Sequence, residues 1–539
     1  MKQNGLHKVI FKISTLMVLM ISILVTSIPS AFAANASNKL PFDDITNSYA
    51  QKEIVRLAGL NILNGTGPRT FSPKKPVTRA EFITMIDRLL KLEPVDNAIS
   101  SFTDVGKNDW YYGWIQAGLN LGIVDGVRPG IFEPQIQISR QEVAALIVRA
   151  TKMKAGSTSS SLPFVDSNKI TSWAIPYVYT IHKNSIMSGE GNKFRPNDAV
   201  TREETAVVLS RILDTPFGVK VSKNQQASVI QMGWQYDSTT TQFINQVKSS
   251  NINTLVPRWF YLENNGVVSD NSNKELMTYA SQYNKKIWAM LGNRSNSELT
   301  HTILSSSITR NKVIQQLTSY VQQYKLAGIN VDFEDVDPVD RDNLTAFIST
   351  LSIELHKIGA VLSIDVSPDL GTDWTDGFDY AKLGKSADYV VLMSYDEHWS
   401  TSPKAGSVSS LPWVEKALNK LILSVPSKKV IMALPFYTRD WSDTPKGIVS
   451  EELSLLRQNQ RISAMNAKLS WNDTTAQYVA TYSKLGIKHS IWAEDSRSLS
   501  IKAHMAANKG IAGYGYWYMG AESLDIWAAI RNVVKYSSY

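Results

Sequence analysis

The chain has 539 residues, too many for one ordinary core, and this length predicts two or more domains. It is 43% hydrophobic and 19% charged, which is typical of globular proteins, and its formal net charge of +8 comes without a basic run dense enough to indicate nucleic-acid binding. The absence of cysteine excludes disulfides and thiolate metal sites. The seven histidines follow no metal-binding spacing, so we expect neither a metal nor a cofactor.

The N-terminus has the pattern of a secretory signal peptide. Lys2, Lys8 and Lys12 precede the apolar stretch ISTLMVLMISILV, and small residues mark a cleavage site after Ala33. We expect residues 1–33 to be removed and the mature chain to have no membrane span. Retention as an uncleaved anchor is the alternative.

Three related segments follow, with a period of about 61 residues. We place these repeats at 40–95, 100–155 and 162–215. Each contains TRAE, SRQE or TREE directly before an apolar helical pattern, so Ser or Thr stands three residues ahead of Glu. This spacing predicts a helix with a capping box in every repeat, and hence an all-α module.

An arginine follows the capping residue in every repeat. The helix macrodipole disfavours a cation in the first turn by up to about 1 kcal/mol, so the recurrence calls for a compensating anion. Either the aspartate of the opening motif forms an internal salt bridge with the arginine, or an external anion binds there. The arginines are Arg79, Arg140 and Arg202, and the aspartates are Asp44, Asp104 and Asp166.

With their opening F-x-D, central Gly turn, F-x-P and T-R-A-E elements, the repeats resemble S-layer homology domains. The resemblance implies a three-fold helical prism that binds pyruvylated secondary cell-wall polymer in grooves between repeats. The three arginines would meet the pyruvate carboxylate, and the three aspartates belong to the same implied site. Trp110 and Trp173 are further sugar-contact candidates, although we favour core packing for both.

Residues 216–227 are rich in turn-forming and polar residues without periodicity, which predicts a linker. In residues 228–539, short β-rich runs alternate with helical stretches, so we expect an α/β domain with a parallel (β/α)8 TIM barrel. The eight runs begin at Ser228, Asn253, Lys285, Gly328, Val361, Asp388, Lys429 and Gly510. The longest gap, between runs seven and eight, predicts a small α+β insertion.

The fourth run, GINVDFE, alternates apolar and polar residues. Alternation turns Ile329, Val331 and Phe333 toward the helices and Asn330, Asp332 and Glu334 into the barrel, with Glu334 at the carboxyl end. Two carboxyls on successive inward positions repel each other when both are ionised, so we expect the pKa of one of them to rise. A neutral acid beside a charged one is how glycosidases divide their catalytic roles. The alternative, acids that merely end a strand, does not explain the inward alternation.

The barrel resembles glycoside hydrolase family 18, whose strand-four signature is D-G-x-D-x-D-x-E. Ala327 and Asn330 replace its first two aspartates, and Asp332 and Glu334 complete it. The other matches are Met393, Tyr395 and Asp396 in M-x-Y-D, Tyr437 and Arg439 in a Y-G-R-x-W-like segment, and Trp517 at the end of run eight.

This resemblance implies substrate-assisted retaining catalysis. Glu334 would protonate the glycosidic oxygen, the substrate's own acetamido carbonyl would attack the anomeric carbon, and Asp332 and Tyr395 would hold the acetamido group. The implied substrate-binding residues are Asn330, Met393, Asp396, Tyr437, Arg439 and Trp517. Because Asn330 cannot take up charge, the family's usual pH behaviour is in question. Asp365 is a weaker site candidate.

The leading hypothesis is therefore a secreted, monomeric hydrolase, attached to the bacterial wall through its repeats and cleaving β-1,4 linkages of N-acetylglucosamine-containing glycan. The N-x-D-F-E and MSYDEHW segments look most like those of spore-cortex and peptidoglycan N-acetylglucosaminidases, which favours peptidoglycan over chitin. A lectin-like wall protein without turnover and a purely structural S-layer subunit are the alternatives.

Overall fold

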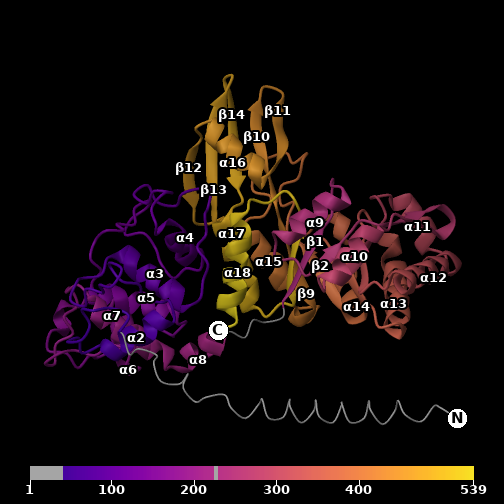
Figure 1. The fold of residues 1–539 in the computed structure, drawn as a ribbon. Coiled ribbons are helices and arrows are strands. Elements are labelled where there is room, and N and C mark those ends of the chain that lie inside the picture. Colours follow the sequence, from indigo (N-terminus) through magenta and orange to yellow (C-terminus); the bar gives the residue numbers. More distant parts are fainter. Residues whose placement is uncertain (1–39, 224–228) are drawn as a thin grey trace, which may run out of the picture.

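The computed structural model describes residues 40–223 and 229–539. A helical module lies beside a barrel, and a small lobe rises above them (Figure 1). The predicted signal peptide falls outside the described residues. Within them, none of the helices combines the length and the apolar character needed to cross a bilayer.

In the described part of the chain, eight parallel strands close into the predicted barrel. Their order is β2-β1-β15-β9-β8-β7-β6-β5, and β2 pairs with β5 to complete the circle. The strands are β1 (Ile230–Trp234), β2 (Thr254–Val256), β5 (Lys286–Gly292), β6 (Gly328–Asp332), β7 (Val361–Val366), β8 (Tyr389–Met393), β9 (Val430–Pro435) and β15 (Gly513–Trp517). A hairpin of β3 (Phe260–Glu263) and β4 (Val267–Asp270) continues from the end of β5.

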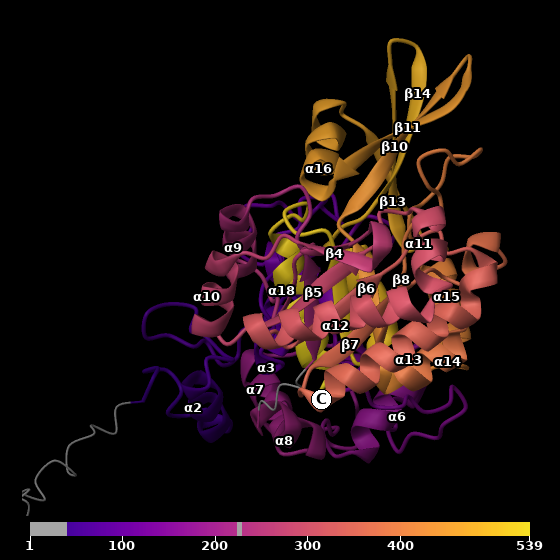
Figure 2. The same ribbon diagram turned by 90° about the vertical axis from the view of Figure 1, so that its right-hand side faces the viewer.

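Helices cover the outside of the barrel, and α12 and α13 cross its near side in Figure 2. Ile329, Val331 and Phe333 are buried between strand and helices, and the Phe333 ring stacks on Phe347 of α13 at 5.9 Å. The predicted alternation of β6 is confirmed. The covering helices are α9 (Thr240–Lys248), α10 (Lys274–Gln282), α11 (Ser297–Leu304), α12 (Ser307–Tyr324), α13 (Arg341–Lys357), α14 (Tyr380–Ser386), α15 (Leu411–Leu421), α17 (Ser496–Asn508) and α18 (Asp525–Ser537).

The lobe is the predicted insertion between the seventh and eighth barrel strands. Its first strand begins two residues after β9 ends, so the lobe grows out of the carboxyl end of the barrel (Figure 2). It is an antiparallel sheet of order β11-β10-β14-β13-β12 with one helix. Its elements are β10 (Tyr437–Thr444), β11 (Gly447–Ser454), α16 (Leu455–Ala464), β12 (Lys468–Asn472), β13 (Gln477–Lys484) and β14 (Ile487–Ala493).

The N-terminal module is a closed ring of three helix pairs. Capping boxes begin the second helix of each pair, as predicted. That helix packs on the first helix of the next repeat, α3 on α4, α5 on α6 and α7 on α2. The helices are α2 (Gln51–Gly59), α3 (Arg79–Leu89), α4 (Tyr112–Asn120), α5 (Arg140–Ala150), α6 (Ile175–Lys183) and α7 (Arg202–Leu213).

Backbone hydrogen bonds close the same ring ahead of the capped helices. The Val77 N–H donates to the Val200 carbonyl at 2.9 Å, Val200 to Ile138 at 3.1 Å, and Ile138 back to Val77 at 3.0 Å. Because each bond joins two repeats, the three capped helix starts are held around one pseudo-three-fold axis.

The prediction of an irregular linker over 216–227 is wrong for its first part, because Pro216–Lys223 forms helix α8. Proline is well suited to a helix start, and Val221 is buried. The Phe217 ring also meets Tyr539, the last residue of the chain, at 5.9 Å. The segment is helical because it packs on the module and on the C-terminus.

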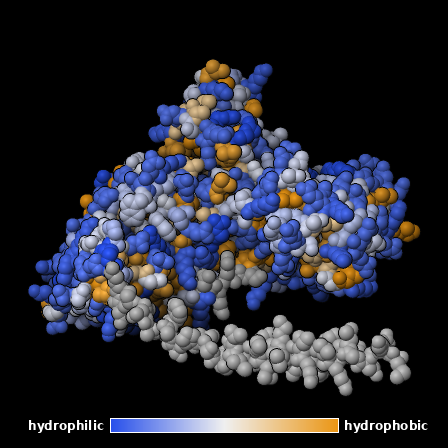
Figure 3. All heavy atoms as spheres, in the orientation of Figure 1, coloured by the Kyte–Doolittle hydropathy of each residue, from blue (hydrophilic) through white to orange (hydrophobic). Residues whose placement is uncertain are grey.

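The module lies against the barrel through α17 and α18, which stand between the two in Figure 1. Arg531 of α18 forms an ion pair with Glu93 at 2.7 Å, and Asn532 exchanges two hydrogen bonds with the Glu93 backbone. Ile99 joins the hydrophobic core of the lobe. The outer face in Figure 3 is mainly hydrophilic, with hydrophobic residues scattered over it.

Candidate functional site

The predicted catalytic residues meet at the carboxyl end of the barrel. A cavity of about 470 Å³ opens there, and four of the predicted residues line it: Glu334, Met393, Tyr395 and Asp396. Its apolar walls include Leu370, Trp374, Trp399 and Trp413. A concave site with aromatic walls and a few convergent polar groups can hold a sugar ring.

Asn330 lies one step below this cavity, fully buried inside the barrel. Its amide donates to Asp365 Oδ1 at 2.7 Å and to Ser363 Oγ at 3.0 Å, and its oxygen accepts from Trp234 Nε1 at 3.2 Å. The inward partner of Asn330 is thus Asp365. Burial and the nearby Asp332 raise the pKa of Asp365, so the Asn330 amide faces an acid that resists ionisation.

Asp332 is the inward carboxyl whose pKa rises. Burial, reinforced by the charge of Glu334, raises its pKa to about 7, and the cation of Arg258 partly opposes this. Its Oδ1 is shielded from solvent and has no hydrogen-bond partner among the described residues. A buried acceptor without a partner costs stability, so this atom is poised for a donor that a ligand supplies.

Glu334 is exposed at the mouth, where residues that follow β5 hold it. Asn293 clamps its backbone, donating to the Glu334 carbonyl at 2.7 Å and accepting from its N–H at 3.1 Å. Ser295 Oγ donates to Glu334 Oε2 at 2.6 Å. Sequence analysis missed both residues. The available signal was a polar segment, NRSNS, directly after a buried strand whose carboxyl end faces the site.

Tyr395 and Asp396 follow β8 and turn into the same cavity. Burial, followed by the charges of Asp365 and Asp332, raises the pKa of Tyr395, so its hydroxyl stays a donor. Asp396 has a φ of 62°, in the left-handed region that aspartate tolerates. Tyr437 donates to Asp396 Oδ1 at 2.6 Å. Burial raises the pKa of Asp396, and the bond from Tyr437 opposes this.

Trp517 and Arg439 flank this group. The Trp517 ring meets Trp234 at 6.0 Å and Tyr236 at 5.3 Å, which places it between the barrel interior and the loop after β1. Arg439 is buried on β10 of the lobe, where it lies 5.9 Å from the Tyr437 ring and reaches Ser450 and Glu452 at 3.4 and 3.5 Å. Its charge lowers the pKa of Asp396, so it lies close behind that residue.

In the helical module, the three predicted arginines are buried. Their guanidinium groups reach across to the next repeat around the ring, so the salt bridge within each repeat, one of the two alternatives that the sequence left open, is wrong. Arg79 pairs with Glu142 at 3.0 Å, and Arg140 pairs with Glu204 at 3.3 Å. Arg202 donates to the Phe71 carbonyl at 2.7 Å. In the second and third repeats, the capping-box glutamate therefore serves as both helix cap and counter-ion.

The opening-motif aspartates instead hold the turn that begins at the phenylalanine of the F-x-P element in their own repeat. Each carboxylate accepts two backbone N–H groups from that turn. The pairs are Asp44 with Phe71 and Ser72, Asp104 with Phe132 and Glu133, and Asp166 with Phe194 and Arg195. Their role in the structure is to hold the loop that precedes the arginine-bearing helix.

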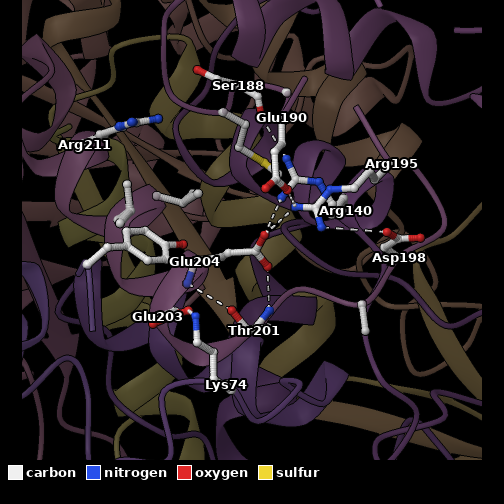
Figure 4. A pocket seen from close by; sticks show the side chains of 16 residues that line it. Lys74, Arg140, Ser188, Glu190, Arg195, Asp198, Thr201, Glu203, Glu204 and Arg211 are labelled. Atoms are coloured by element: carbon white, nitrogen blue, oxygen red, sulfur yellow. Dashed lines mark hydrogen bonds and ion pairs between the residues drawn. The ribbon is translucent and has the colours of Figure 1, made fainter. Parts of the chain in front are cut away.

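A pocket of about 500 Å³ opens beside Arg140, between residues of all three repeats (Figure 4). Arg195, which sequence analysis did not single out, points into it and pairs with Glu204 at 2.8 Å and with Glu190 at 3.4 Å. Lys74 lines it as well and is paired with Glu203. The pocket is therefore lined by several cationic side chains, each paired with a carboxylate that also lines it.

The expectation of core packing for Trp110 and Trp173 is wrong. The two residues are 59% and 48% exposed, because each lies in the turn that precedes a helix and not on its buried face. Both remain available as surface aromatic contacts.

Comparison with known families agrees with this architecture. The profile of glycosyl hydrolases family 18 matches residues 229–522, and the profile of the S-layer homology domain matches residues 41–83, 101–144 and 163–206. The chain belongs to glycosyl hydrolases family 18. It is a glycosidase that carries three S-layer homology domains, which indicate attachment to the cell wall or S-layer.

Relatives in the curated set include an uncharacterized glycosylase, YvbX, of Bacillus subtilis, 31% identical over 53% of this chain and 85% of that protein. The cortical fragment-lytic enzyme of the same organism is 24% identical over 51% of this chain and 67% of that protein. Among solved structures, the Bacillus cereus spore cortex-lytic enzyme SleL superposes with a TM-score of 0.53 at 23% identity, covering 56% of this chain and 74% of that one. This last likeness supports the fold.

Proposed function

We propose that this protein is exported, is fixed to the wall by its repeats, and cleaves β-1,4 linkages of an N-acetylglucosamine-containing glycan by substrate-assisted retaining catalysis. The observation that carries the proposal is the unpartnered, buried Oδ1 of Asp332 beside the exposed carboxyl of Glu334. Asp332 Oδ1 can accept a hydrogen bond from a ligand, and the Glu334 carboxyl faces the entrance, where a glycosidic oxygen would lie.

In this mechanism Glu334, oriented by Ser295, gives its proton to the leaving oxygen. Asp332 accepts the acetamido N–H, and Tyr395 donates to the acetamido oxygen, so the amide is turned toward the anomeric carbon. Attack by that oxygen forms a cyclic oxazolinium ion and releases the aglycone. Glu334 then takes a proton from the water that opens the ring, which gives net retention. Asp332 balances the cationic intermediate in its ionised form, which burial and Glu334 disfavour in the free protein.

The test compares the parent with Glu334→Gln on peptidoglycan and on chito-oligosaccharides, by assay of new reducing ends. The variant should lose at least about a hundredfold in rate because it cannot donate a proton, while its affinity for the glycan remains. Equal release by the two proteins would refute the enzymatic role of Glu334. The mass of the fragments released from peptidoglycan identifies the bond that is cut.

We also propose that peptidoglycan is the favoured substrate and that Arg79, Arg140 and Arg202, with the loops that Asp44, Asp104 and Asp166 hold, build the binding sites for an anionic secondary wall polymer. The pocket beside Arg140 supports this, because it gathers cations whose present partners an anion can replace. Binding to sacculi should disappear when the secondary polymer is stripped from them. Undiminished binding to stripped sacculi would contradict the anchoring role.

A further inference from the structure

A second cleft opens at the carboxyl end of the barrel, and one of its lining residues, Tyr236, is in ring contact with Trp517. It has a volume of about 570 Å³ and lies where β1, β2 and β3 meet the mouth of the barrel. Its lining is polar and aromatic, and includes Gln235, Tyr236, Arg258, Tyr261, Asn271 and Asn273. Of these residues only Arg258 bears on the mechanism above, through its effect on the pKa of Asp332.

A chain of ring contacts connects this cleft to the predicted sugar-binding tryptophan. Tyr236 lies 5.3 Å from the Trp517 ring, and the Arg258 guanidinium lies 4.9 Å from the Tyr236 ring and 5.9 Å from the Tyr261 ring. A glycan bound over Trp517 would thus pass into the cleft and bring its next sugar to Arg258.

Arg258 has the features of an unfilled anion site. It follows the carboxyl end of β2 directly, and its Nε, although shielded from solvent, has no hydrogen-bond partner among the described residues. The rings of Tyr236 and Tyr261 flank the guanidinium. The carboxylate that lines the cleft, Asp237, is exposed on the loop after β1.

We infer that this cleft is a subsite for an acidic sugar, in which Arg258 binds a carboxylate carried by the glycan unit next to the one over Trp517. The inference rests on the proposed function. Guanidinium and carboxylate match in shape and can form two parallel charge-assisted hydrogen bonds. In a wall glycan that carboxylate is the lactyl acid of N-acetylmuramic acid without its peptide, whereas chitin has no carboxylate. The cleft therefore selects peptide-free wall glycan over chitin.

The experiment compares Arg258→Gln with the parent on three soluble substrates: peptide-free glycan strands, the same strands with their lactyl carboxyls converted to methyl amides, and chito-oligosaccharides. The measured quantity is the ratio of kcat/KM for the acidic strand to that for its neutral amide. Because Arg258 also lowers the pKa of Asp332, its loss changes the chemistry on every substrate, and the ratio within one enzyme cancels that change.

The ratio should fall at least about tenfold in Arg258→Gln, since a charged hydrogen-bonded pair is lost. Arg294→Gln is the matched control, because Arg294 also lies near the Tyr261 ring, at 4.3 Å, but is paired with Glu263 at 2.9 Å. It should leave the ratio unchanged. Strands whose lactyl groups each carry one alanine present their carboxylate one residue farther from the sugar. They therefore distinguish a site for the lactyl carboxylate from a site for a carboxylate at that greater distance.

An unchanged ratio in Arg258→Gln, or an equal fall in Arg294→Gln, would overturn the inference. If the parent cleaves none of the substrates, the proposed function fails. The subsite can then still be tested by measuring the dissociation constants of acidic and amidated strands for the parent and for Arg258→Gln. Tighter binding of the acidic strand that disappears in the variant supports the subsite. No preference in the parent refutes it.

Discussion

Asp332 shows how the barrel prepares one carboxyl for chemistry. Burial and the neighbouring Glu334 raise its pKa to about 7, well above its ordinary value of 3.8. The folded state therefore binds a proton that the unfolded chain has already lost between about pH 4 and pH 7. Stability must fall as pH rises through this range, because ionising Asp332 in place is unfavourable.

Replacing Asp332 with Asn should remove that cost while abolishing most activity. At pH 8 Asp332→Asn should be more stable than the parent by roughly 2–4 kcal/mol, and the difference should vanish near pH 4. Urea unfolding at the two pH values measures it. Asp335→Asn, which changes an exposed acid three positions further on, is the control. A gain that does not depend on pH would contradict the account.

Asn330 replaces an acid of the family signature, and its environment explains why an amide fits. Its Nδ2 donates to Asp365 Oδ1 at 2.7 Å, where a second carboxylate would face an acceptor. Asn330→Asp should therefore lose stability, by about 1–3 kcal/mol at pH 8 and less at pH 5, where the two acids can share a proton. Thermal unfolding across pH measures this. Adding Asp365→Asn should restore stability, and failure to do so would disprove the pairing.

At the scale of elements, the repeats are held by carboxylates that satisfy backbone N–H groups. Asp104 accepts from Phe132 at 2.9 Å and from Glu133 at 2.7 Å, whereas Asp125 in the same repeat forms one exposed ion pair with Arg149. Asp104→Ala should cost about 1–3 kcal/mol, because the turn loses its acceptors, and Asp125→Ala should cost less than about 0.5 kcal/mol. Equal losses in calorimetry would show that the turn does not depend on Asp104.

Local patterns predicted these elements well. Capping boxes, the eight barrel strands and the inward alternation of β6 all depend on residues a few positions apart, so their periodicity is visible in the sequence. Segment 216–223 was mistaken for a linker because its helix depends on packing against Tyr539, more than three hundred positions away.

Partners across the barrel were not predictable in this way. Ser295 reaches Glu334, and Asn330 reaches Asp365, only because barrel closure brings the ends of different strands together. Arg79 and Arg140 pair with glutamates more than sixty positions ahead for the same reason, since the ring of helices sets their neighbours. The sequence pattern predicts which residues have a catalytic or binding role, but their hydrogen-bond partners depend on the tertiary fold.

At the scale of the whole molecule, the wall-binding module rests directly on the barrel. The ion pair between Glu93 and Arg531, at 2.7 Å, joins the end of the first repeat to α18. Docking of this kind fixes the direction in which the barrel mouth faces while the repeats hold the wall. The position of the repeats on the wall thereby sets the orientation of the catalytic barrel.

Reversing one charge at this contact should loosen the docking. Glu93→Arg places two cations together and should increase the radius of gyration in small-angle scattering and the rate of proteolysis near residues 91–101, because like charges repel. Glu93→Arg combined with Arg531→Glu should restore the compact form. If the single variant stays as compact as the parent, other contacts hold the module in place.

The proposed mechanism requires that the substrate's own acetamido group, held by Asp332 and Tyr395, attacks the anomeric carbon. The most direct measurement compares kcat/KM on two oligosaccharides that differ only in the sugar before the cut, N-acetylated in one and de-N-acetylated in the other. Loss of the internal nucleophile should reduce the rate at least about a thousandfold, given the advantage of an intramolecular reaction. Similar rates on the two substrates would contradict the account.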